Sequence, residues 1–126
     1  MKQLISKDVQ NYKMDSAVYA LRKRVINFIY EIKEHVPNLP RIEVRVGKAK
    51  KRNLLGQAVL NKNIVWITDV ALKNNDKELR NTVYHELLHA VYGTDHDEKC
   101  PLMQSKLNTV LNKEDCIKHF LKYIKN

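Results

Sequence analysis

Cysteine is scarce in this chain of 126 residues, since only Cys100 and Cys116 are present. The first residues are charged and contain no apolar core of the kind that a secretory signal has. Two cysteines in such a chain are typical of free thiols rather than of a disulfide framework. No apolar run approaches the roughly 20 residues that a membrane span requires. We therefore expect a cytoplasmic protein with reduced cysteines and no membrane partner.

Internal repeats, low-complexity segments and linkers are also absent, so residues 1–126 should form a single domain. The chain is long enough to bury one modest core without disulfides. It has 23 basic and 14 acidic residues, a net charge of +9, which makes a nucleic-acid partner possible. The basic residues are spread along the chain, however, and the cluster Lys48–Arg52 has no aromatic neighbours. This pattern favours a solvated loop over a nucleic-acid site.

The first half of the sequence predicts one helix and three strands. Apolar residues recur every three or four positions over 15–35, which predicts a helix that ends before Pro37. Alternating apolar residues predict a strand over 41–46, followed by a basic loop over 47–53. Two further strands, over 55–60 and 64–68, are separated by three residues rich in asparagine and should form a hairpin.

The second half predicts two more helices. Asp76 should cap a helix with an apolar stripe, and Gly93 should end it in a left-handed conformation. A turn-rich segment over 94–103 separates this helix from a last one over 113–124. The order predicts an α+β fold in which a small sheet of about three strands packs against an N-terminal helix and a central helix, with a C-terminal helix.

Residues 85–89 read His-Glu-Leu-Leu-His within the predicted central helix. Positions i and i+4 share one helix face, so His85 and His89 could bind one zinc ion. Glu86 lies next to the first histidine, where a carboxylate can take a proton from a zinc-bound water. The neighbouring residues are apolar, and buried histidines without a partner would be costly, so a metal ion is the expected partner.

A tetrahedral catalytic zinc site needs a third protein ligand. Gly93 lets the chain turn back towards the metal, and His96 follows three residues later. The stretch from His85 to Met103, HELLHAVYGTDHDEKCPLM, resembles the HExxHxxGxxH signature and Met-turn of the metzincin zinc peptidases. The resemblance implies that His85, His89 and His96 bind zinc and that Glu86 is the general base. It also implies that Met103 lies beneath the metal.

The spacing of this stretch departs from the metzincin pattern by one residue. The glycine lies eight residues after the first histidine and His96 lies eleven after it, whereas Asp95 occupies the tenth position. The snapalysins, which this stretch also resembles, use an aspartate there as the third ligand. Because the Gly-x-x-His spacing is intact, we favour His96, with Asp95 and then Glu114 of the last helix as alternatives.

These residues predict a zinc-dependent metalloendopeptidase that hydrolyses a peptide or protein substrate by Glu86-assisted attack of a zinc-bound water. The zincin resemblance implies that an edge strand, for which Gly56–Leu60 is the candidate, pairs with the substrate backbone. One alternative is a metal-dependent endoribonuclease, because Gly93–His96 resembles the end of the HGxLHLxGYDH motif of bacterial rRNA-maturation enzymes. A second alternative is a binding module with a structural zinc, in which Cys100 is the fourth ligand. The sequence does not indicate the oligomeric state.

Overall fold

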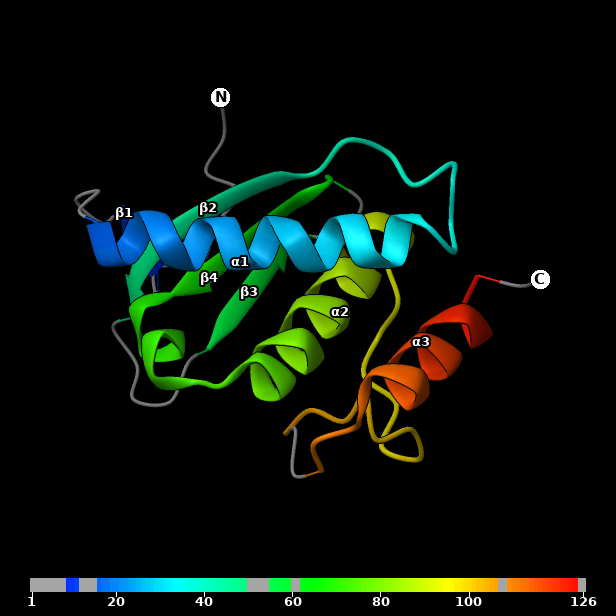
Figure 1. The fold of residues 1–126 in the computed structure, drawn as a ribbon. Coiled ribbons are helices and arrows are strands. Elements are labelled where there is room, and N and C mark those ends of the chain that lie inside the picture. The colour runs from blue at the N-terminus through cyan, green and yellow to red at the C-terminus, as the bar shows by residue number, and fades with distance from the viewer. Residues whose placement is uncertain (1–8, 12–15, 50–54, 60–61, 107–108, 125–126) are drawn as a thin grey trace.

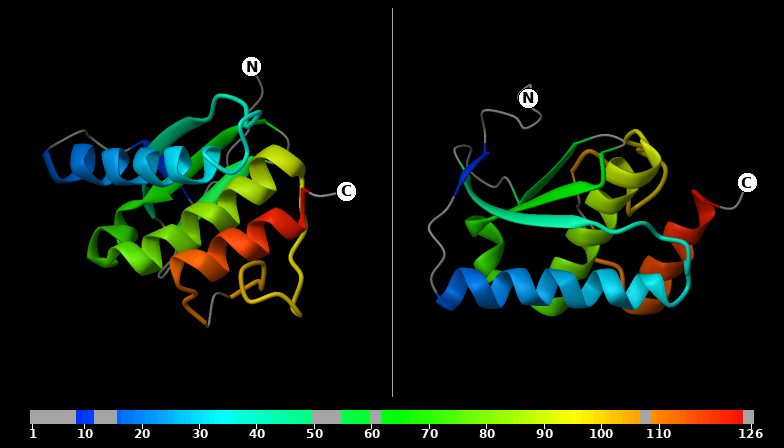
Figure 2. Two further views of the ribbon diagram at one scale, coloured as in Figure 1. Left: turned by 45° about the vertical axis from the view of Figure 1, so that its right-hand side comes forward. Right: turned by 90° about the horizontal axis from the view of Figure 1, so that it is seen from above.

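A mixed four-stranded sheet carries two helices on one face, and a third helix lies beside the second (Figures 1 and 2). The computed structural model describes residues 9–11, 16–49, 55–59, 62–106 and 109–124. This architecture confirms the predicted α+β class, with its N-terminal, central and C-terminal helices. Among the described residues, no helix is both long enough and apolar enough to cross a membrane.

The sheet has the strand order β1-β2-β4-β3. Strand β2 (Glu43–Ala49) lies parallel to β4 (Ile64–Thr68), and β3 (Gly56–Val59) pairs antiparallel with β4 at the edge. The predicted β3–β4 hairpin is therefore confirmed. Its turn contains Asn63 with φ 57°, a left-handed conformation that asparagine tolerates better than most residues.

The predicted loop after residue 46 begins too early, because β2 continues through Gly47 to Ala49. These three residues pair antiparallel with β1 (Val9–Asn11), a short strand that the sequence did not indicate. Three residues are too few for an alternating pattern to be recognised. The rest of the basic cluster, residues 50–52, lies outside the described residues.

Helix α1 (Ser16–Lys33) runs across the sheet and packs on β2, as its apolar period predicts. Helix α2 (Asp76–Tyr92) packs on β3 and β4, and it follows a short 3₁₀ helix, η1 (Asp69–Lys73). The core consists of fully buried side chains from the helices and the sheet, which include Leu21, Ile32, Ile67, Leu79, Leu87 and Leu88.

The N-cap of α2 is Asn75 and not Asp76, so the predicted cap is wrong by one residue. The Asn75 side chain accepts a hydrogen bond from the Glu78 amide at 2.8 Å, and the Glu78 carboxylate accepts one from the Asn75 amide at 2.9 Å. This reciprocal capping box satisfies two amides that would otherwise lack partners. Asp76 takes no part in this capping box and instead forms an ion pair with Arg24 of α1.

Helix α3 (Lys113–Lys122) packs against α2. A buried asparagine of α2 binds the backbone of the segment that leads into α3. The Asn81 side chain of α2 donates to the Leu111 carbonyl at 2.9 Å and accepts from the Leu111 amide at 3.0 Å. A second joint involves Glu31 of α1, whose carboxylate accepts hydrogen bonds from Arg80 and Tyr84 of α2. These polar contacts fix α2 relative to both of its neighbours.

We predict that Asn81→Ala destabilises the fold by about 2–4 kcal/mol, because it leaves the amide and carbonyl of Leu111 buried without partners. Urea unfolding followed by circular dichroism measures the change. Asn27→Ala, on the exposed side of α1, is the matched control and should change stability by less than about 0.5 kcal/mol. Equal effects of the two substitutions would contradict the assigned role of Asn81.

Candidate metal centre

Three histidine side chains converge in the structure, and they are the three that the sequence selects. One ring nitrogen from each of His85, His89 and His96 lies within 4.8 Å of one from each of the others. The ring centroids of His85 and His89 are 4.7 Å apart, and that of His96 lies 5.2 and 4.8 Å from them. This is the arrangement of groups that could hold one metal ion.

The end of α2 brings the third histidine back to the other two. Gly93 has φ 63°, and its amide donates to the His89 carbonyl at 3.1 Å. The Thr94 amide donates to the Leu88 carbonyl at 3.1 Å. This left-handed turn, which glycine adopts without strain, reverses the chain so that His96 lies beside the helix rather than beyond its end.

Backbone carbonyls fix the orientation of the first two imidazoles. The Nδ1 of His85 lies 2.7 Å from the Leu102 carbonyl oxygen, and the Nδ1 of His89 lies 2.5 Å from that of Thr94. A carbonyl oxygen only accepts hydrogen bonds, so each Nδ1 carries the hydrogen and each Nε2 carries a lone pair. The two Nε2 atoms face each other at 3.2 Å. Two lone pairs in this position call for a cation between them.

Both helix histidines are held in the neutral form that binds metals. Burial is the main cause that lowers the pKa of His85 to about 4. The hydrogen bond to the Leu102 carbonyl opposes this shift, and proximity to His89 and His96 adds to it. Burial likewise lowers the pKa of His89. The charged form is therefore disfavoured at neutral pH even before a metal is considered.

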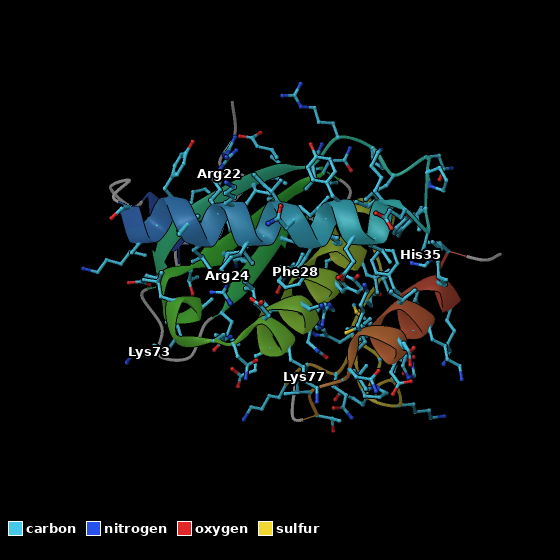
Figure 3. The ribbon with its side chains drawn as sticks, in the orientation of Figure 1. Arg22, Arg24, Phe28, His35, Lys73 and Lys77 are labelled. Carbon is cyan, nitrogen blue, oxygen red and sulfur yellow. The ribbon has the colours of Figure 1, made fainter. Side chains whose placement is uncertain are left out.

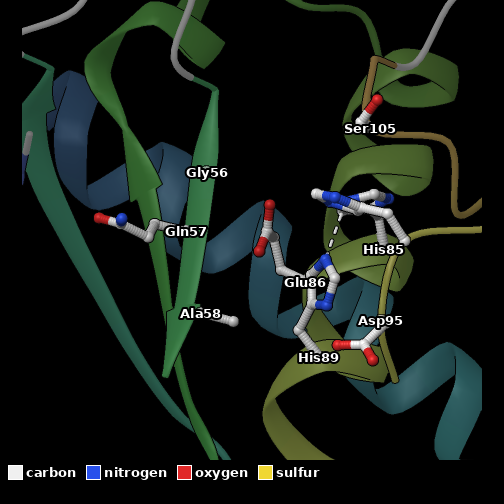
Figure 4. Close-up of a pocket in the computed structure, with 9 residues that line it drawn as sticks. Gly56, Gln57, Ala58, His85, Glu86, His89, Asp95 and Ser105 are labelled. Atoms are coloured by element: carbon white, nitrogen blue, oxygen red, sulfur yellow. Dashed lines mark hydrogen bonds between the residues drawn. The ribbon is translucent and has the colours of Figure 1, made fainter. Parts of the chain in front are cut away.

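Glu86 is buried between α2 and the edge strand, as Figure 4 shows. Burial raises the pKa of its carboxyl group to about 8. Its side chain points towards β3 and lies beside the histidines, so it borders the candidate metal position without belonging to the ligand group. A carboxylate in this place can act on a molecule bound next to the metal.

Strand β3 forms the opposite wall of an open cleft of about 440 Å³, which also contains the three histidines and Glu86. Ala58 points into the cleft and Gln57 points to the other face of the sheet, as alternation along a strand requires (Figure 4). Because β3 is the last strand in the sheet order, its outer backbone faces the cleft without a neighbouring strand among the described residues. The predicted edge position is confirmed, although Leu60 lies outside the described residues.

The structure distinguishes His96 from the alternative third ligands. Asp95 lines the cleft and lies near enough to His89 to act on its charge, but it does not belong to the group of converging ligand atoms. Glu114 is exposed in the first turn of α3. The turn at Gly93 accommodates the one extra residue relative to the metzincin spacing. His96, at the intact Gly-x-x-His spacing, therefore lies beside the other two histidines.

The residue after His96 is the best-anchored residue of this loop. The Asp97 amide donates to the Met103 carbonyl at 2.8 Å, and the Asp97 carbonyl accepts from the Cys100 amide at 3.0 Å. The Asp97 carboxylate accepts hydrogen bonds from the Lys99 amide and from the Tyr123 hydroxyl, each at 3.0 Å. Because His96 itself is exposed, its position depends on this anchored neighbour.

Met103 and Cys100, which the sequence also selects, are both buried. Met103 is fully buried and follows Leu102, whose carbonyl orients His85. Cys100 is also buried, and its sulfur lies 3.6 Å from Nδ1 of His119 on α3. Cys100 therefore contacts α3 and is not part of the three-histidine group.

Sequence reasoning missed several residues that shape the centre. The carbonyls of Thr94 and Leu102 carry no side-chain signal, and the contacts of Tyr123 and His119 depend on how α3 packs. Gly56 was noted only as part of an edge strand. A Cβ atom at this position would lie 3.1 Å from Cγ of Glu86 and 3.2 Å from Cγ2 of Thr82, so the absence of a side chain makes room for Glu86.

Comparison with known proteins adds no family to these observations. No protein-family model matches the chain, and neither the curated proteins nor the solved structures include one with significant similarity to it.

We predict that Gly56→Ala displaces Glu86 and reduces any activity that depends on it, while the metal ion is still bound. The added methyl group would lie 3.1 Å from Cγ of Glu86, which is tighter than nine in ten such contacts, and none of its three nearest atoms belongs to a histidine. Metal content by elemental analysis should be unchanged. Ala58→Gly, on the same strand and in the same cleft, is the control. Loss of metal in Gly56→Ala would contradict this assignment.

We predict that Tyr123→Phe weakens metal affinity by about tenfold, because it removes the hydrogen bond that anchors Asp97 beside His96. His96→Ala should weaken affinity further, since it removes a ligand. Asp95→Asn should have the smallest effect of the three, because Asp95 is not in the ligand group. Competition with a chromophoric chelator ranks them, and the reverse order for His96 and Asp95 would assign the third ligand to Asp95.

Proposed function

We propose that the chain is a zinc-dependent metalloendopeptidase. The observation behind this proposal is the geometry of the three histidines. The Nε2 atoms of His85 and His89 lie 3.2 Å apart with their lone pairs facing each other, and a third imidazole converges on them. The Glu86 carboxyl group lies beside these rings. His85 and His89 would hold zinc through these two Nε2 atoms, and His96, whose ring nitrogen lies within 4.8 Å of theirs, would complete the set of ligands. Three imidazoles are also a donor set that suits zinc.

An ion held by three protein ligands keeps a fourth position open, and zinc there supplies Lewis-acid activation of water and of a carbonyl group. Glu86 then accepts the proton of the water whose oxygen attacks the peptide carbonyl carbon. When the C–N bond breaks, Glu86 returns that proton to the nitrogen of the leaving amine. Burial makes the Glu86 carboxylate a stronger base than a solvated one, and a zinc ion at the adjacent site would favour the deprotonated form that accepts the proton.

Strand β3 supports an extended substrate. Its outer edge borders the cleft, and a peptide can pair with it through main-chain hydrogen bonds, as strands do when they extend a sheet. The wall of the cleft here consists of Gly56 and Ala58, which are small and leave room for substrate side chains. A substrate recognised mainly through its backbone would be a peptide or an unfolded segment of protein.

Glu86 favours peptide hydrolysis over the ribonuclease alternative. The motif of the rRNA-maturation enzymes has glycine after its first histidine, whereas this chain places a buried carboxyl group there. A structural zinc is disfavoured by Cys100, because its sulfur lies against His119 rather than in the ligand group.

We predict that Glu86→Gln lowers peptide hydrolysis by at least about 10²–10⁴-fold, the usual contribution of general acid–base catalysis, with close to one zinc per chain retained. The variant keeps the size of the side chain and removes its basicity. Activity should be measured on unfolded proteins and mixed peptides, with structured and single-stranded RNA in parallel. Zinc is measured by elemental analysis on the same samples.

Glu114→Gln is the matched control, since Glu114 is exposed on α3 and does not line the cleft. It should retain both zinc and full activity. RNA cleavage that persists in Glu86→Gln, with no peptide cleavage by the wild type, would instead establish the ribonuclease. Less than a tenth of an equivalent of zinc in the wild type after loading and gel filtration would exclude the metal centre.

A further inference from the structure

The outward face of α1 carries an alternation of aromatic and basic side chains. Tyr19, Arg22, Ile26, Tyr30 and Lys33 follow one another at spacings of three or four residues and so share one face of the helix. Tyr19 is 63% exposed and Tyr30 is 64% exposed, whereas among the described residues Val110 is the only other large hydrophobic side chain classed as exposed. The two tyrosines are eleven residues apart, which is about 16 Å along a helix.

A groove runs beside this face, between α1 and the segment that leads into β2. It consists of two adjoining hollows that share Arg22, Arg41 and Ile42. One extends along α1 past Tyr30, and the other extends to Lys62 at the β3–β4 turn. The second view of Figure 2 looks onto this side of α1 and β2. The lining combines isoleucine side chains with basic side chains that are far apart in the sequence.

The cations of this groove lack acidic partners among the described residues. Arg22 donates through Nε to the Val44 carbonyl, and Lys33 donates to the Leu39 carbonyl, so both retain their full charge. No ion pair joins Arg41 or Lys62 to a described carboxylate.

The one acid among the lining residues and a further arginine of α1 are already paired. The single acid that lines the groove, Glu43, is paired with Arg45. By contrast, Arg24, which points to the opposite side of α1 in Figure 3, is neutralised by Asp76. The groove therefore concentrates positive charge that no described carboxylate neutralises.

We propose that this groove, lined by Arg22, Lys33, Arg41, Lys62 and Tyr30, binds single-stranded nucleic acid, with Tyr19 on the same face of α1. Uncompensated cations along a groove suit the phosphodiester backbone, and exposed tyrosines provide faces on which bases stack. A second copy of the chain would bring the same positive charge against itself, which disfavours self-association through this face. The groove shares no residue with the histidine cleft, so binding here is separate from the proposed hydrolysis.

The test is fluorescence anisotropy of a labelled 12-residue oligothymidylate titrated with the full chain at several salt concentrations. Three or four phosphate contacts should make the logarithm of affinity fall with the logarithm of salt with a slope of about −2 to −3. Arg41→Glu combined with Lys62→Glu should weaken binding by more than tenfold. Tyr30→Ala, which leaves the charge unchanged, should weaken it by about fivefold or more through lost stacking.

The control pair is Lys77→Glu with Lys118→Glu, which changes the net charge equally at exposed positions of α2 and α3 outside the groove. It should weaken binding by less than threefold. An equal loss in both pairs would show attraction by net charge alone and overturn the proposal. Binding of phosphatidylglycerol vesicles or a polyglutamate peptide that depends on the groove, with no groove-dependent binding of the oligonucleotide, would overturn it as well.

Discussion

The Nδ1 hydrogens of His85 and His89 are donated to the carbonyl oxygens of Leu102 and Thr94, and the rest of the candidate centre depends on these two bonds. They fix the tautomer of each ring, turn both Nε2 lone pairs towards one point and tie α2 to the loop that carries His96. Without them the rings could rotate, and the third histidine would have no fixed distance from the other two. The loop is therefore part of the site as much as the helix is.

Burying polar groups such as His85 and Glu86 on a helix reduces the stability of the fold. His85 and Glu86 occupy positions on α2 that an apolar residue would fill at lower free energy, and the two Nε2 atoms face each other without a hydrogen between them. The capping box at Asn75 and the buried joints at Asn81 and Glu31 stabilise the same helix from its other sides. Metal binding would offset the unfavourable approach of the two Nε2 lone pairs, so metal affinity is coupled to folding.

Most of the elements were predictable because their signals are local. The apolar period of α1, the Asn-rich turn and the glycine that ends α2 each act within a few residues, and the structure follows them. The motif around His85 was equally local. Strand β1 was missed because three residues carry no period, and the cap was misplaced by one residue because Asn75 and Asp76 are both good caps by type.

Contacts between distant parts of the chain could not be read from the sequence. The pairing of Asp97 with Tyr123 joins residues 26 positions apart, and the space that Gly56 leaves for Glu86 depends on the packing of β3 on α2. The positive charge of the groove could not be predicted for the same reason. Its basic residues are far apart in the sequence, and only the fold brings them together.

Arg22, Arg41 and Lys62 meet in one groove although 40 residues separate the first from the last. The β3–β4 hairpin links this groove to the cleft, since Ala58 lines the cleft and Lys62 lines the groove. The two surfaces therefore share a single structural element and no residue. A substitution within either lining can change one surface and leave the residues of the other in place, which makes their contributions separable by experiment.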